Sequence, residues 1–183
     1  RQLFGLSALT ALVSSYSQKA HAANATAKQS RYTPVQTLGV ATAEWRYHNG
    51  AKEFHLTAEP VKRQFAEGFM VNAWGYNGST PGPTIEVIEG DRVRILVTNH
   101  LPEKTCVHWH GLIIPNGMDG VGGLTQAHIP VGETYAYEFT VKHSGTFMYH
   151  SHSDEMVQIA MGSMGFFIVH PKNSAFRPVD KDY

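Results

Sequence analysis

Cysteine, charge and long apolar runs are all scarce in this chain of 183 residues. Cys106 is the only cysteine, which excludes an internal disulfide framework and any cysteine-rich zinc or iron–sulfur site. The 15 basic side chains balance the 15 acidic ones, so nucleic acid is not an expected partner. No apolar run reaches the roughly 20 residues that a membrane-spanning helix needs, so no membrane span is expected. Histidine, in contrast, occurs 11 times.

The first 22 residues have the pattern of an export signal, and the sequence does not begin with methionine. Residues 3–13 form an apolar run of the length of a signal h-region, and residues 20–22 (AHA) supply a small-x-small cleavage pattern. Arg1 and the residues after it resemble the second half of a twin-arginine signal that lacks its first arginine. We therefore expect residues 1–22 to direct export, with a buried N-terminal helix as the alternative.

Short β-type segments separated by turn signals fill residues 52–172. The alternation is cleanest where Val93, Ile95 and Val97 would share one face of a strand. The expected strands cover residues 53–58, 69–74, 91–98, 106–114, 133–141, 145–151 and 164–170, and residues 154–161 could form a short helix. Strands at this spacing, with no amphipathic helices between them, favour an all-β antiparallel sandwich or barrel.

The segments on either side of this region differ from it in composition. Residues 23–51 are polar and aperiodic, which is typical of a linker or a loosely attached arm. Residues 173–183 are expected to be a linker that enters a second domain outside this sequence. The predicted organisation is one domain over residues 52–172, with a disordered or separate leader at 1–22.

Two H-x-H pairs lie on expected strands: His108-Trp109-His110 and His150-Ser151-His152. Residues i and i+2 of a strand project from the same face, so each pair directs two imidazoles toward one point. Neutral imidazole suits copper, zinc, nickel or iron, and copper(II) binds most tightly of the divalent series. Because two such strands would bring four nitrogens together, the pattern predicts a metal centre.

These motifs also carry a family resemblance. Residues 105–111 (TCVHWHG) and 145–152 (GTFMYHSH) resemble the N-terminal domain of multicopper oxidases, most closely the bacterial copper-resistance and laccase-like branch. Residues 76–85, 116–126, 129–134 and 160–162 are similar to that family as well, so the resemblance extends over about residues 52–171. It implies a cupredoxin-like Greek-key β-sandwich in a periplasmic or otherwise exported bacterial protein.

The resemblance implies a role for each paired histidine. His108 would be a ligand of a mononuclear type 2 copper, and His110, His150 and His152 would be ligands of a binuclear type 3 pair. In the family these coppers reduce dioxygen to water with electrons from a separate type 1 copper. The electron donor would be a small substrate, and copper(I), manganese(II) and phenolic compounds all stay open.

Asp119 and Ser151 complete what the resemblance implies. Asp119 matches an acidic residue that assists proton delivery near the copper centre, and a turn-forming role before Gly120 is the alternative. Ser151 stands at the position where a type 1 site would need a cysteine thiolate, so the type 1 copper is expected outside this chain. A second set of histidines would come from a C-terminal cupredoxin domain, in cis or from another subunit, and the chain alone is predicted to be inactive.

Other sulfur and imidazole groups are less informative. Cys106 could add a soft ligand for copper(I), but a buried, inert small residue is the favoured interpretation. Core packing beneath the short helix is the favoured role of four methionines: Met148, Met156, Met161 and Met164. The unpaired histidines are interpreted as surface or loop residues: His48, His55, His100, His128, His143 and His170.

Two alternative functions remain compatible with the sequence. One is a stand-alone periplasmic copper-binding module for storage or delivery, since the ligands are present without a type 1 site. The other is a subunit of a two-domain laccase-like oxidase that completes its clusters between subunits. A nitrite reductase relative is disfavoured, because such proteins carry the type 1 cysteine in their N-terminal domain, where this chain has Ser151.

Overall fold

A computed structural model describes residues 32–173 and 179–183. The expected export signal at residues 1–22 lies outside the described residues. No helix in the described part of the chain is long and apolar enough to span a membrane.

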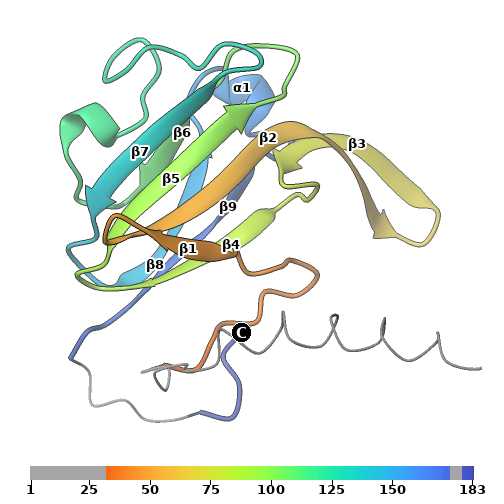
Figure 1. The fold of residues 1–183 in the computed structure, drawn as a ribbon. Helices are drawn as coiled ribbons and strands as arrows, with labels where there is room; N and C mark the ends of the chain where they lie inside the picture. The colour runs from red at the N-terminus through yellow and green to blue at the C-terminus, as the bar shows by residue number, and fades with distance from the viewer. Residues whose placement is uncertain (1–31, 174–178) are drawn as a thin grey trace, which may run out of the picture. The chain divides into compact units, whose positions relative to one another are not determined.

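Two β-sheets pack into a sandwich of the cupredoxin type, which confirms the expected fold class (Figure 1). The first sheet has the order β1-β2-β5-β7, with β3 paired to β2, and contains β1 (Trp45–His48), β2 (Ala51–Ala66), β3 (Phe69–Tyr76), β5 (Arg92–Asn99) and β7 (Thr134–Thr140). The second has the order β4-β9-β8-β6 and contains β4 (Gly82–Ile88), β9 (Met164–His170), β8 (Gly145–Ser151) and β6 (Val107–His110).

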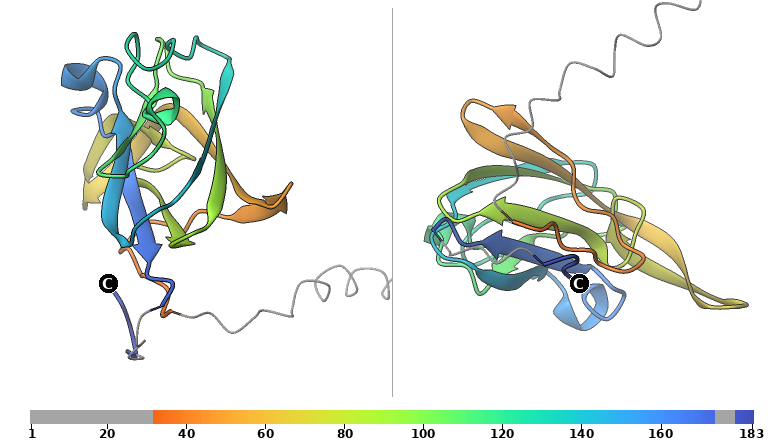
Figure 2. Two further views of the ribbon diagram at one scale, coloured as in Figure 1. Left: turned by 90° about the vertical axis from the view of Figure 1, so that its left-hand side faces the viewer. Right: turned by 90° about the horizontal axis from the view of Figure 1, so that it is seen from below.

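Two short helices complete the described elements. The 3-10 helix η1 (Asn116–Met118) follows β6, and the helix α1 (Glu155–Gln158) lies between β8 and β9. Figures 1 and 2 place α1 at the same end of the sandwich as the loop that connects η1 to β7. α1 is shorter than the helix expected over residues 154–161.

Both sheets are mixed, whereas the sequence pattern favoured antiparallel pairing alone. β2 pairs in parallel with β5, and β4 pairs in parallel with β9. The chain crosses from the first sheet to the second after β3 and returns for β5. Strands that neighbour each other are therefore often distant in sequence, and local alternation carries no information about their relative direction.

The core lies between the sheets and is centred on Trp109. The Trp109 ring lies 5.1 Å from the ring of Tyr137, 6.1 Å from that of Tyr149 and 5.9 Å from that of Phe167. Val93, Ile95 and Val97 are fully buried, as their alternation predicted. Since Trp109 points into this core, its neighbours His108 and His110 must point away from it.

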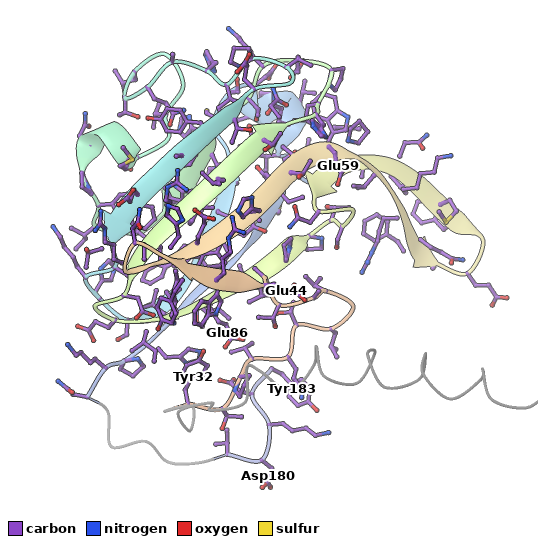
Figure 3. The ribbon with its side chains drawn as sticks, viewed as in Figure 1. Tyr32, Glu44, Glu59, Glu86, Asp180 and Tyr183 are labelled. Carbon is purple, nitrogen blue, oxygen red and sulfur yellow. The ribbon has the colours of Figure 1, made fainter. Side chains whose placement is uncertain are left out.

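The described part of residues 23–51, which the sequence predicts to be a linker or a loosely attached arm, contacts the sandwich before β1 begins. Ala43 is buried and its backbone N–H donates to the carbonyl of Thr84 at 2.7 Å. The backbone N–H of Val35 donates to the buried carboxylate of Glu86, and Figure 3 shows Tyr32 beside Glu86. These contacts use backbone groups and one distant carboxylate, which leave no periodic signal in a polar sequence.

The C-terminal residues also contact this arm. The backbone N–H of Gln36 donates to the carbonyl of Asp182 at 2.8 Å, and Val35 forms an isolated parallel bridge with Asp182. The end of the expected linker at residues 173–183 is therefore in contact with the domain.

Candidate metal centre

The two H-x-H pairs lie on adjacent strands of the second sheet. β6 pairs antiparallel with β8, and the register places His108 directly opposite His150 and His110 opposite Met148. His152 follows β8, which ends at Ser151. The rings of all four histidines that the sequence singled out are neighbours, whereas His152 lies outside the group of three whose ring nitrogens come within 4.8 Å of one another.

The other three imidazoles surround His108. The His108 ring centroid lies 5.5 Å from that of His110, 5.4 Å from that of His150 and 5.4 Å from that of His152. One ring nitrogen from each of His108, His110 and His150 lies within 4.8 Å of the others. His110 Nδ1 and His150 Nε2 are 3.1 Å apart. This spacing is compatible with a shared metal site.

Three of the four rings are held through their Nδ1 atoms. His108 Nδ1 lies 2.7 Å from the carbonyl oxygen of Asp119, and His150 Nδ1 lies 2.8 Å from the carbonyl oxygen of Ser151. His152 Nδ1 lies 2.9 Å from Oε1 of Glu155. A carbonyl or carboxylate can only accept, so each Nδ1 carries a proton, and in the neutral imidazole Nε2 then keeps its lone pair. A metal ligand requires such a lone pair.

The histidines of the site are buried to different degrees. His150 is 7% exposed, whereas the side chain of His108 is 18% exposed and that of His152 is 33% exposed. Burial lowers the pKa of His150, with a further decrease from the neighbouring imidazoles. Both effects disfavour the protonated form, so His150 is predisposed to the neutral state in which imidazole coordinates a metal.

The histidines occupy the outer face of the second sheet. On β8 the core-facing residue Tyr149 is fully buried, while Thr146 on the opposite face is exposed. On β9 the outward-facing Phe166 is 43% exposed and pairs with Met148. Imidazoles and apolar side chains thus share a face that no described residue of this chain covers completely.

Asp119 approaches the centre mainly through its backbone. Its carbonyl accepts from His108 Nδ1, and its carboxylate Oδ1 lies 3.5 Å from the same nitrogen. Asp119 also ends η1, and Gly120 after it has a φ of +84°. A Cβ at Gly120 would lie 1.7 Å from the carbonyl oxygen of Val107. The turn therefore presses against β6, and Asp119 both caps η1 and contacts the His108 ring.

Cys106 is fully buried and lies outside the three-histidine cluster. Its Sγ is 3.0 Å from the position that a Cβ on Gly122 would take, and the His128 ring borders that same position. Burial raises the pKa of the thiol, which keeps it protonated and a poor ligand. These observations support the prediction of an inert small residue.

Two other expectations are corrected. Met156 is 87% exposed, and the other three methionines of that group are only partly buried and lie outside the core cluster. His170 is not a surface residue: its side chain is 11% exposed, its ring stacks on Tyr32 at 3.6 Å, and its Nε2 lies 3.1 Å from the Glu86 carboxylate. Stacking and a distant carboxylate again leave no sequence pattern.

A buried polar network anchors the site and was missed in the sequence. Gln158 is fully buried. Its Oε1 accepts from the hydroxyls of Thr105 and Ser151, and its Nε2 donates to Glu103 Oε1 at 2.6 Å and to the carbonyl of Lys104 at 2.9 Å. Gln158 thereby ties the centre of the second histidine pair to the segment that leads into β6.

The fold and the donor set together define a β-sandwich with a candidate histidine metal site on one sheet. The model of a protein family described as multicopper oxidase matches residues 57–174. The chain therefore belongs to the multicopper oxidase family, as the resemblance predicted.

Relatives of known sequence and structure agree with this assignment. Laccase-1 of Cryptococcus neoformans var. grubii is 34% identical over 99% of this chain and 30% of its own length. Copper resistance protein A of Escherichia coli is 41% identical over 58% of this chain and 17% of its own length. A multicopper oxidase structure from Pseudomonas thermotolerans has a TM-score of 0.65 and 36% identity, covering 68% of this chain and 31% of that one. The chain thus spans less than a third of the length of these relatives.

Proposed function

We propose that this chain is the N-terminal cupredoxin domain of an exported multicopper oxidase and supplies half of the histidine ligands of a trinuclear copper centre. The observation that carries the proposal is the arrangement of three imidazoles around His108, with Nδ1 already hydrogen-bonded in three of the four rings. Such fixed rings pay little additional ordering entropy when a metal binds.

The donor set fits copper. Imidazole nitrogens suit copper(II), and Ser151, between His150 and His152, offers no thiolate. By family resemblance His108 would be a type 2 ligand, and His110, His150 and His152 would be type 3 ligands. When bound, the copper centre would supply the reduction of dioxygen to water.

The residues of this chain would position that centre. The outer-face location of the histidines leaves room for a C-terminal cupredoxin domain, from the same polypeptide or another subunit, to supply the remaining ligands. The carboxylate of Asp119, beside His108, would deliver protons toward dioxygen. The electron-donating substrate, whether copper(I), manganese(II) or a phenol, would be oxidised at a type 1 copper outside these residues.

A second candidate function is a copper-binding module for storage or delivery. One observation favours it: three imidazole nitrogens within 4.8 Å of one another belong to this chain alone, and they would suffice to hold one ion. The coding sequence beyond Tyr183 separates the two candidates. A downstream His-Cys-His segment supports the oxidase, and a stop codon directly after Tyr183 supports the module.

Copper affinity tests the site directly. Copper(II) is titrated against a competing chelator for the 183-residue chain and for four variants: His108→Ala, His110→Ala, His150→Ala and His152→Ala. His100→Ala is the matched control, because His100 is exposed and lies outside the cluster. Loss of a ligand is expected to weaken binding at least as much as loss of an outer-shell partner, about tenfold or more. If all four variants bind copper as His100→Ala does, the proposal is wrong.

A further inference from the structure

We propose that Glu155 is a positioning residue for His152, holding its imidazole with the proton on Nδ1 so that a bare Nε2 faces the other histidines. The orientation of the His152 ring is argued from the geometry alone. Only the consequence for copper binding rests on the proposed function.

His152 needs such a partner because the sheet does not hold it. β8 ends at Ser151, so His152 lies beyond the strand that fixes His150. Its ring nevertheless lies beside the cluster, with its centroid 5.4 Å from that of His108 and 6.2 Å from that of His150. Its Nδ1 lies 2.9 Å from Glu155 Oε1. His108 and His150 use backbone carbonyls at the corresponding position, whereas His152 uses a side chain.

The backbone that carries the Glu155 carboxylate is itself fixed in place. Glu155 begins α1, and Gln158 at the end of α1 is fully buried with four side-chain hydrogen bonds. The carbonyl of Glu155 accepts from the backbone N–H of Ile159. Because α1 is pinned at its buried end, the Glu155 side chain is presented to His152 from a fixed backbone.

The Glu155–His152 pair contributes little to the stability of the fold. The side chain of Glu155 is 47% exposed and that of His152 is 33% exposed, and ion pairs at such exposure contribute about 0–1 kcal/mol. Replacing Glu155 should therefore leave the fold intact. Without an acceptor at Nδ1, the neutral ring can carry its proton on Nε2, which removes the lone pair that a metal needs.

The test uses the 183-residue chain with ¹⁵N-labelled histidine and three substitutions. Glu155→Ala removes the acceptor, and Glu155→Gln keeps a neutral acceptor in the same place. Asp154→Asn is the matched control, since it removes the same charge one residue earlier, from an exposed side chain. The tautomer of His152 is measured in the metal-free protein by long-range ¹H–¹⁵N NMR at pH 8. Copper(II) affinity is measured by chelator competition.

The expected result is that His152 carries its proton on Nδ1 in the unsubstituted chain, in Asp154→Asn and in Glu155→Gln, and loses this preference in Glu155→Ala. Copper affinity should fall about 10- to 100-fold in Glu155→Ala, fall less in Glu155→Gln, and stay unchanged in Asp154→Asn. If the tautomer of His152 is the same in Glu155→Ala as in Asp154→Asn, the positioning role is overturned. If the tautomer changes as expected but the unsubstituted chain binds no copper through its histidines, the proposed function fails while the role of Glu155 in orienting the ring stands.

Discussion

The substitution Gln158→Ala removes the residue that connects the two histidine pairs. Gln158 is fully buried, and its amide accepts from Thr105 and Ser151 and donates to Glu103 and Lys104. Each net hydrogen bond of this kind is worth about 1 kcal/mol. Thr105 Oγ1 and Ser151 Oγ lie 3.3 Å apart and can bond to each other after the substitution, which recovers part of the loss.

We therefore expect Gln158→Ala to lower the free energy of unfolding by about 3 kcal/mol. Domains of this size have about 5–15 kcal/mol in all, so the loss would be readily visible. The assay is guanidinium unfolding followed by tryptophan fluorescence, because Trp109 is fully buried. A shift of the midpoint with an unchanged slope would show a change of stability alone.

Gln64→Ala is the matched control, because Gln64 is exposed on β2 and surface substitutions stay within about 0.5 kcal/mol. If Gln158→Ala changes the free energy of unfolding by no more than Gln64→Ala does, the amide network does not anchor the site, and the argument for a pinned α1 is refuted as well.

Two further predictions concern the backbone and pH. Gly120→Ala should destabilise the fold by about 2–4 kcal/mol in the same unfolding assay, because the residue has a left-handed backbone and a Cβ there would strike the carbonyl of Val107. Gly117→Ala is the control, since nothing lies within 4 Å of its new Cβ. Equal effects of the two substitutions would contradict this prediction. The pKa of the Glu53 carboxyl is held at about 2, below its ordinary 4.5. The hydrogen bond from Arg46 is the largest cause, and hydrogen bonds from other neighbours add to it. The unfolded chain then binds a proton at Glu53 in this window while the folded chain does not, so stability should fall as pH decreases from about 4.5 toward 2. Unfolding curves measured across this window should show a shallower pH dependence for Glu53→Gln, and an identical dependence would contradict the assignment.

The sequence predicts those features of the candidate site that depend on residues close together in the chain. His108 and His110, like His150 and His152, are two residues apart, and on a strand that spacing alone places both imidazoles on one face. The buried face of β5 followed in the same way from alternation. The register that places His108 opposite His150 came only with the structure.

The features that were not predicted depend on contacts between distant residues. The carbonyl of Asp119 fixes the His108 ring from the far side of a turn. Glu86 binds the arm through Val35 and also lies beside His170, and neither contact alters the periodicity of the sequence. Glu155 is the exception that a closer examination could have found: it lies three residues after His152, a spacing at which side chains meet when the chain makes a helical turn.

We expect His108, His110, His150 and His152 to enclose copper, and a crystal structure of the copper-loaded protein would show whether they do. Diffraction data collected on either side of the copper absorption edge locate the metal independently of any assumption about the site. We expect an anomalous peak enclosed by these four imidazoles, with Nδ1 of His108 still bonded to the carbonyl of Asp119. A copper peak elsewhere on the chain, with these four imidazoles free of metal, would contradict it.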